Sequence, residues 1–140
     1  MDGALAAAAA HGHVVGVGVD LVEVARVGRL LSRRGHAAGR LFTDLERSAA
    51  GAGPMRTQRL AARFAAKEAV YKALGGHGPL GFQDIEVVRP IGRPAQVRLH
   101  GAAAELAARR GVSAVLVSMS HVGSLAMAQA VAVGPCPCGS

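Results

Sequence analysis

Two lysines and a glutamate lie within one short segment, and their types point to phosphate chemistry. Lys67 and Lys72 are the only lysines among sixteen basic residues, and the other fourteen are arginines. Glu68 lies between them. A lysine ammonium is a compact, mobile charge that suits phosphate oxygens, whereas an arginine guanidinium is a rigid planar fork. Because the chain otherwise uses arginine, the two lysines predict a site that requires amines.

The segment that carries these residues, from about residue 57 to 74, is predicted to be a helix. It is rich in Ala, contains no Pro and is followed by Gly75, which favours a helix end. At 3.6 residues per turn, Glu68 and Lys72 lie on one face. The neighbouring face carries Arg63, Lys67 and Tyr71. An ordinary surface pair between Glu68 and Lys72 explains the same spacing, so the helix alone leaves both interpretations open.

A second carboxylate, Asp20, lies inside a Val-rich run over residues 13–24 that is typical of a buried strand. A carboxylate among valines needs a partner, because burying it unpaired is costly. Asp20 therefore either caps the following helix or binds a metal. Oxygen ligands suit Mg²⁺, which keeps waters and shares substrate phosphates. Gly16 and Gly18 match only the start of a dinucleotide-binding fingerprint, because its third glycine is missing.

Composition limits the class of protein and of partner. The chain has 140 residues, enough for one domain, and a formal charge of +7, which implies an acidic partner. Nucleic acid is the weaker option, because one Tyr, three Phe and no Trp leave little to stack on bases. Cys136 and Cys138 are too close for the usual zinc spacing. The Ala-rich N-terminus lacks a basic start, and polar residues interrupt the uncharged C-terminal stretch, so we expect a cytoplasmic protein.

The remaining pattern predicts one α+β domain over residues 14–133, with helices packed on a mainly antiparallel sheet. Flexible segments are expected at 1–13 and 134–140. Thr43 and Glu46 fit a capping box that opens a short helix. Further helices are expected over 22–34 and 102–110, and further strands over 83–88, 95–99, 113–121 and 125–133. In the last strand Ala126, Ala128, Ala130 and Ala132 share one face, and a subunit interface is one candidate for what covers it.

Together these segments resemble the holo-acyl-carrier-protein synthase family, the small 4′-phosphopantetheinyl transferases. The matching blocks are GVGVDLVEVARV (16–27), FTDLE (42–46), RFAAKEAVYKALG (63–75), GRP (92–94) and VSMSHVGSLAMAQAVA (117–132). They follow the family's order over residues 14–133, and the first and third are specific as a pair. The resemblance implies transfer of the 4′-phosphopantetheine arm of coenzyme A to a serine of an apo-acyl carrier protein, with release of adenosine 3′,5′-bisphosphate.

The resemblance also implies roles for particular residues. Asp20 and Glu68 would bind Mg²⁺, and Glu68 and Lys72 would be catalytic, with Lys72 on the diphosphate of coenzyme A. Further contacts to coenzyme A would come from Arg63 and Lys67 near the phosphates, Ser120 and His121 near the 3′-phosphate, and Pro94 near the adenine. A second interpretation of His121 is a strand-end residue that only hydrogen-bonds the turn. Val122 stands where some relatives carry an acidic residue, and a contact of Glu23 with the metal is left open.

Recognition of the carrier is assigned to a basic stripe. The resemblance implies that Arg26 belongs to the docking face for the acidic carrier protein, and Arg29 and Arg33 follow at helical spacing; a solvated face explains the same spacing. The family further implies a homotrimer with each site shared between neighbours, since larger relatives carry two similar halves. Two alternatives stay open: another Mg²⁺-dependent nucleotide or pyrophosphate enzyme, and a basic binding module for RNA or acidic proteins without catalysis.

Overall fold

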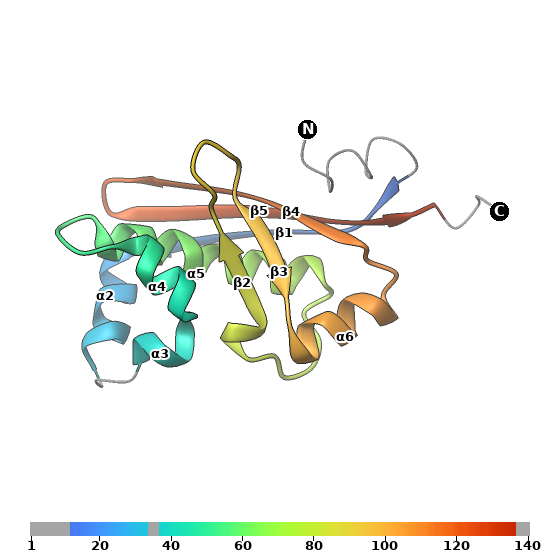
Figure 1. Ribbon diagram of the computed structural model, residues 1–140, viewed down its shortest axis with the longest axis horizontal. Helices are drawn as coiled ribbons and strands as arrows, with labels where there is room; N and C mark the ends of the chain where they lie inside the picture. The colour runs from blue at the N-terminus through green and yellow to red at the C-terminus, as the bar shows by residue number, and fades with distance from the viewer. Residues whose placement is uncertain (1–11, 34–36, 137–140) are drawn as a thin grey trace.

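A five-stranded antiparallel sheet, in the order β1-β5-β4-β3-β2, forms the centre of the fold, with the helices gathered on one side of its long strands (Figure 1). The structure is a computed structural model that describes residues 12–33 and 37–136. The elements are β1 Gly12–Glu23, α2 Val24–Ser32, α3 Ala37–Leu41, α4 Asp44–Ala50, α5 Arg56–Ala73, η1 Phe82–Asp84, β2 Ile85–Val88, β3 Gln96–Leu99, α6 Gly101–Arg109, β4 Ala114–Val122 and β5 Leu125–Pro135. The predicted α+β class is confirmed.

The long helix α5 covers one face of β1, β5 and β4, which we call the inner face. Strand register places Gly18 opposite Ala130 and Asp20 opposite Ala128 on this face. The four alanines of β5 are at most 1 % exposed, and α5 of the same chain covers them. The proposal that this alanine face is a subunit interface is therefore wrong. Alanine is needed here because the helix approaches the sheet closely.

The two glycines of β1 show how close this approach is. A Cβ atom on Gly18 would lie 1.9 Å from the carbonyl oxygen of Ala69, and one on Gly16 would lie 2.1 Å from that of Ala73. Neither position has room for a side chain. The two glycines therefore serve the contact between β1 and α5, and the weak dinucleotide-binding interpretation is not needed to explain them.

The opposite face of the same strands, the outer face, is apolar and is not covered by any of the described residues. Val17 pairs with Val131 and Leu21 with Met127 on this side. Its exposed large residues are Val14, Val17, Val19, Leu21, Leu125 and Met127, with exposed fractions between 41 % and 64 %. An apolar surface of this kind is typical of a protein–protein contact.

Most predicted elements are present with small shifts at their ends. The capping box of α4 is confirmed: the Thr43 hydroxyl accepts from the Glu46 amide at 3.2 Å, and the Glu46 carboxylate accepts from the Thr43 amide at 2.9 Å. Residues 82–84 form a 3₁₀ turn instead of starting a strand, and the short helix α3 was not predicted.

The chain ends differ slightly from the prediction. Gly12 and His13 already belong to β1, and Gly134 and Pro135 still belong to β5. Residues 1–11 of the predicted flexible extension, and Cys138 of the tail, lie outside the described residues. Cys136 is exposed and is a free thiol. Among the described helices, none is both long and apolar enough to cross a membrane.

Candidate functional site

Asp20, Glu68 and Lys72 meet where β1 lies against α5. The Lys72 ammonium lies 3.3 Å from Asp20 Oδ1 and donates a hydrogen bond to the Val19 carbonyl at 2.9 Å. The Lys72 side chain is 51 % exposed and that of Asp20 19 % exposed. A lysine ammonium has three N–H donors, so one remains for a ligand. The predicted convergence of these residues is therefore present in the fold.

Glu68 completes a pair of carboxylates. Burial raises its pKa, and the negative charge of Asp20 raises it further, while Lys72 and Arg26 act in the opposite direction. Two carboxylates that repel one another in a half-buried setting favour the binding of a cation. Asp20 does not cap the next helix, because Glu23 occupies the N-cap position of α2 without a side-chain hydrogen bond. The capping role predicted for Asp20 is therefore wrong, and its role as a metal ligand stays a prediction.

The donor set fits magnesium better than a structural zinc ion. Within residues 12–33 and 37–136 no group of three or more His, Cys, Asp and Glu side chains is placed to hold a metal. Glu23 does not join the pair, because the strand register puts it beside Leu125 on the outer face. Two carboxylates with open positions suit Mg²⁺, which retains water and takes oxygens from substrate phosphates.

Lys67 lies elsewhere, although it is the neighbour of Glu68 in the sequence. It is 1 % exposed and forms an ion pair of 2.7 Å with Glu46, which is also buried. Its ammonium also donates to the carbonyls of Phe82 and Ile85 at 2.7 and 2.6 Å. All three of its donors are occupied, which argues against the predicted contact with coenzyme A phosphates, so we leave Lys67 out of the proposed site. The buried role of Glu46 was not predicted, because its capping position already explained it.

Arg63 is a buried cation with unused hydrogen-bonding capacity. Its residue is 6 % exposed, one nitrogen donates to the Arg59 carbonyl at 3.2 Å, and Nε has no partner among the described residues. Burial lowers its pKa; Glu46 opposes this, and the positive charges of Arg89 and Arg59 lower it further. A guanidinium that is incompletely paired and lies near other guanidinium groups suits an anionic ligand such as a phosphate.

The remaining predicted ligand residues are not bonded to this carboxylate pair in the single chain. Pro94 is exposed between β2 and β3, and Ser120 and His121 are exposed near the end of β4. Register places Ser120 on the outer face, opposite Met127, and His121 on the inner face, opposite Ala126. No hydrogen bond or ion pair of the described residues joins these three to Asp20, Glu68 or Lys72, and none involves the His121 ring.

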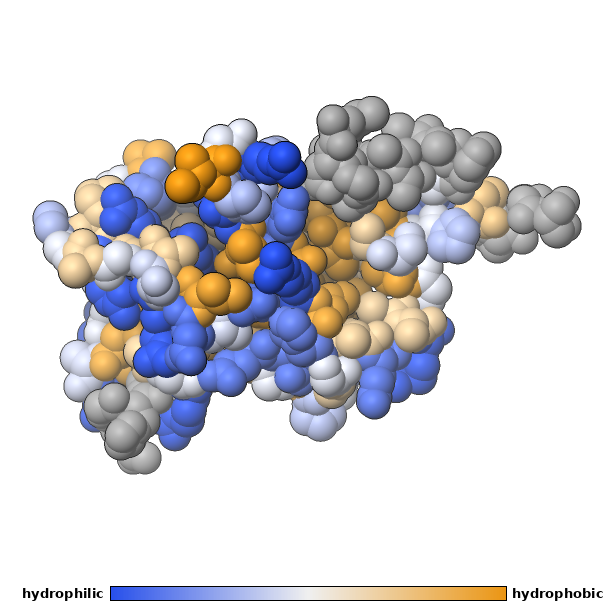
Figure 2. Space-filling model, viewed as in Figure 1, coloured by the Kyte–Doolittle hydropathy of each residue, from blue (hydrophilic) through white to orange (hydrophobic). Residues whose placement is uncertain are grey.

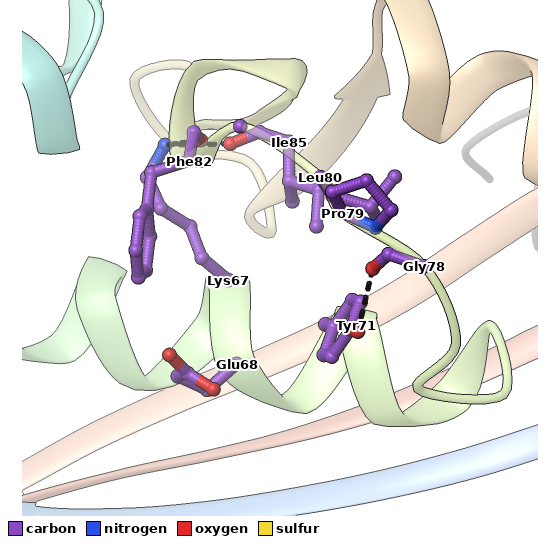
Figure 3. A pocket seen from close by; sticks show the side chains of 9 residues that line it. Lys67, Glu68, Tyr71, Gly78, Pro79, Leu80, Phe82 and Ile85 are labelled. Carbon is purple, nitrogen blue, oxygen red and sulfur yellow. Dashed lines mark hydrogen bonds between the residues drawn. The ribbon is translucent and has the colours of Figure 1, made fainter.

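A pocket of about 280 Å³ lies beside Glu68, between α5 and the segment that leads into β2 (Figure 3). Its lining is mainly apolar and consists of Lys67, Glu68, Tyr71, Gly78, Pro79, Leu80, Gly81, Phe82 and Ile85. The Tyr71 hydroxyl donates to the Gly78 carbonyl at 2.8 Å and so holds the loop at its edge. No sequence pattern joined the helix residues to the loop that follows them, so the pocket was not predicted.

The basic stripe lies on α2. Arg26, Arg29 and Arg33 are exposed, and the charge of Arg26 acts on Glu68. Figure 2 shows many strongly hydrophilic residues over the end of the molecule formed by α2, α3 and α4. The stripe therefore begins next to the carboxylate pair, where a macromolecular substrate could present a group to it.

Comparisons with known proteins agree with these features. The family model "4′-phosphopantetheinyl transferase superfamily" matches residues 16–130. A holo-[acyl-carrier-protein] synthase of Desulforudis audaxviator is 48 % identical over 125 residues, which cover 87 % of this chain and 95 % of the relative.

Solved structures are similar as well. The holo-[acyl-carrier-protein] synthase of Neisseria meningitidis has a TM-score of 0.75 and 34 % identity, covering 86 % of this chain and 98 % of that one. An ACPS-CoA complex from Chronobacterium ammoniagenes has a TM-score of 0.68 and 34 % identity, covering 83 % and 94 %. With a family model over most of its length and relatives this similar, the chain belongs to the 4′-phosphopantetheinyl transferase superfamily.

Proposed function

We propose that Asp20, Glu68 and Lys72 form the centre at which this transferase carries out its reaction, with Mg²⁺ bound by the two carboxylates. The reaction is that of a holo-[acyl-carrier-protein] synthase, which moves the 4′-phosphopantetheine arm of coenzyme A to a serine of an acyl carrier protein. The serine oxygen attacks the β-phosphorus while its proton passes to a general base, the bond from that phosphorus to the bridging oxygen breaks, and adenosine 3′,5′-bisphosphate leaves. The observation that carries the proposal is the half-buried carboxylate pair beside an accessible lysine.

Phosphoryl transfer asks a protein mainly for positioning and for charge compensation. When bound, Mg²⁺ would neutralise charge on the diphosphate and hold it in one orientation. Lys72 keeps one N–H donor for a phosphate oxygen and is anchored by Val19 and Asp20. The guanidinium of Arg63, whose buried Nε has no partner among the described residues, would add positive charge near another phosphate of coenzyme A. These cations would stabilise the charge that develops on the leaving group.

The carrier protein is proposed to dock on the stripe of Arg26, Arg29 and Arg33. All three side chains are exposed, and the charge of Arg26 reaches Glu68. A carrier held by its acidic surface on α2 would therefore present its serine close to the carboxylate pair. Complementary charge of this kind mainly speeds encounter and selects the partner.

The active unit is proposed to be a homotrimer in which two chains build each site. Two features of the single chain support this. The outer face exposes an apolar surface on β1 and β5 that a second copy would cover. In addition, Pro94, Ser120 and His121 form no hydrogen bond or ion pair with the carboxylate pair of their own chain, so we propose that a neighbouring chain supplies these ligand residues.

Mass spectrometry of an apo-acyl carrier protein tests the reaction and the metal site together. With coenzyme A and limiting Mg²⁺, the wild type should add one phosphopantetheine mass to the carrier. Asp20→Asn and Glu68→Gln should each lower the rate by about a hundredfold or more, since each removes a ligand charge. Glu105→Gln is the matched control, because Glu105 is exposed on α6, outside both the carboxylate pair and the outer face, and should keep its rate.

Two outcomes would contradict this assignment. No mass gain with any tested carrier would leave a basic binding module as the better interpretation. Normal rates for both Asp20→Asn and Glu68→Gln would rule out the proposed metal site without contradicting the transfer reaction.

Refolding a mixture of two inactive variants tests the shared site. Asp20→Ala and His121→Ala chains should each be poorly active alone, and mixed oligomers should regain part of the wild-type rate. The gain arises because some sites then take an intact Asp20 from one chain and an intact His121 from the next. A mixture as inactive as its parents, with mixing confirmed by native mass spectrometry, would rule out sharing.

A further inference from the structure

The ion pair between Lys67 and Glu46 has no part in the proposed transfer reaction. Both side chains are nevertheless buried, and each makes several hydrogen bonds. The Lys67 ammonium is held by Glu46 Oε1 at 2.7 Å and by the carbonyls of Phe82 and Ile85. The Glu46 carboxylate also accepts from the amides of Thr43 at 2.9 Å and Val87 at 3.0 Å. The pair thereby joins α4, α5, η1 and β2.

Stability alone is a weak reason to keep such a pair. Removing two charges from water is costly, and apolar residues of similar volume often stabilise a core as well or better. Hydrogen bonds add what apolar contacts lack, which is direction. Because Lys67 binds two carbonyls of one segment and a carboxylate of another, both the rotation of α5 about its axis and its distance from residues 82–85 are fixed.

Because Lys67 is next to Glu68 on α5, the restraint on Lys67 also fixes the direction of Glu68. Lys67 and Glu68 are neighbours on α5, and Figure 3 shows their side chains leaving the helix in different directions. Lys67 reaches the 82–85 segment, while Glu68 lies one helical turn before Lys72, whose ammonium is 3.3 Å from Asp20 Oδ1. Any rotation of α5 about its axis would move both side chains together.

The same restraint holds the wall of the pocket. Phe82 and Ile85, whose carbonyls bind Lys67, line the pocket together with Glu68. The Phe82 ring stacks on Phe64 of α5, with centroids 5.4 Å apart and planes at 19°. On the opposite side of α5, Gly18 of β1 touches the helix backbone. The helix is therefore held from both sides at the level of Glu68.

We propose that Lys67 and Glu46 are positioning residues that aim Glu68 at Asp20 and fix the pocket wall beside it. The inference rests on the proposed function of Glu68 as a metal ligand. It predicts that loss of the pair weakens metal binding by more than the accompanying loss of stability explains.

The test compares Lys67→Met with Leu106→Ala, using Mn²⁺ as a spectroscopic probe for the magnesium site. Leu106 is a buried residue of α6, outside both the pocket lining and the carboxylate pair, and its truncation also lowers stability. We would measure the melting temperature and the Mn²⁺ affinity in the presence of coenzyme A, from the free Mn²⁺ signal in electron paramagnetic resonance. Both variants should melt earlier, but only Lys67→Met should bind Mn²⁺ more weakly, by about tenfold, the usual effect of losing a group that orients a metal ligand.

A double variant separates geometry from charge. Lys67→Met leaves the Glu46 carboxylate unpaired, whereas Lys67→Met with Glu46→Met removes both charges and should melt later than the single variant. If the pair acts by fixing the orientation of α5, Mn²⁺ binding stays weak in the double variant. If Lys67→Met does not fold, Glu46→Gln takes its place in the comparison with Leu106→Ala, with the same expected result.

Two results would overturn the inference. One is recovery of Mn²⁺ affinity together with the melting temperature in the double variant. The other is equal weakening of Mn²⁺ binding by Leu106→Ala. A wild-type protein that neither binds Mn²⁺ with coenzyme A nor transfers the arm would overturn the proposed function, and with it this inference.

Discussion

The inner and outer faces of the β1–β5 ladder are built from alternate residues of the same strands. They differ in the size of their side chains and in what packs against them. The inner face carries Gly16, Gly18, Asp20 and four alanines, and α5 covers it. The outer face carries valine, leucine and methionine side chains, and nothing in the described chain covers it. Small residues mark the face that a helix backbone must approach closely, while large exposed residues mark the face left for another molecule.

This difference has a functional reason. Asp20 lies on β1 and Glu68 on α5, so the distance between the two elements sets the distance between the two carboxylates. Glycine and alanine bring the helix near enough for the charge of Asp20 to act on Glu68. The outer face does not have to bring two elements close together, and it exposes apolar side chains instead. Four variants test this difference between the faces.

The largest effect is expected from Gly18→Ala. Its Cβ would lie 1.9 Å from the Ala69 carbonyl oxygen, so β1 and α5 must separate or fail to pack. Overpacking usually costs about 1–3 kcal/mol and more when backbone is the obstacle, so we expect a loss of about 3 kcal/mol in denaturant unfolding and nearly complete loss of transfer. Gly28→Ala is the control, since its Cβ would meet only the Thr57 methyl at 3.6 Å. That change should stabilise α2 by about 0.5–1 kcal/mol. A fully active Gly18→Ala protein would contradict the close-contact explanation.

Leu21→Glu should disrupt the outer face without touching the inner one. Leu21 is 61 % exposed in the single chain, and a charge there would be buried unpaired in the proposed trimer. We expect light scattering to report a mass near the 14.2 kDa chain and the transfer rate to fall by about a hundredfold. Leu45→Glu is the matched control, because Leu45 is 56 % exposed on α4 and should tolerate the charge. Equal oligomeric states for both variants would exclude this face as the subunit contact.

A smaller, selective effect is expected where α2 borders the inner-face site. Arg26→Glu should raise the KM for the carrier protein by about tenfold and leave the KM for coenzyme A nearly unchanged. Arg98→Glu on β3 removes the same charge from outside the stripe and serves as the control. Added salt should weaken carrier binding by the wild type in the same direction. Equal changes in both KM values would argue against docking on this stripe.

The smallest effect concerns the stability cost of the carboxylate pair itself. The pKa of Glu68 is raised in the folded protein, so folding favours its protonated form and its ionised form destabilises the fold. In the absence of Mg²⁺, Glu68→Gln should therefore melt at a higher temperature than the wild type at neutral pH. The difference should vanish well below pH 4.5, the ordinary value for a glutamate. Added Mg²⁺ should raise the melting temperature of the wild type only, and a lower melting temperature for Glu68→Gln at neutral pH would contradict this sign.

Local sequence patterns were enough to predict most elements and the residues that carry chemistry. Period-two and period-3.6 patterns located the long strands and helix α5, and the capping box located α4, because these signals are local. The position of Asp20 among valines predicted a buried carboxylate with a partner, since an unpaired one is too costly. The matching blocks then predicted the family that the comparisons confirm.

What covers each face depends on the packing of distant segments, which a local sequence pattern does not show. Periodicity fixes the angle between Lys67 and Lys72 on their helix, but the rotation of that helix against the sheet depends on packing with distant segments. That rotation puts Lys72 beside Asp20 and buries Lys67 against Glu46. For the same reason the alanine face of β5 could not be assigned to helix or subunit from its pattern. A helix of the same chain and a second subunit would both favour small residues on this face. Only the fold shows that α5 occupies it.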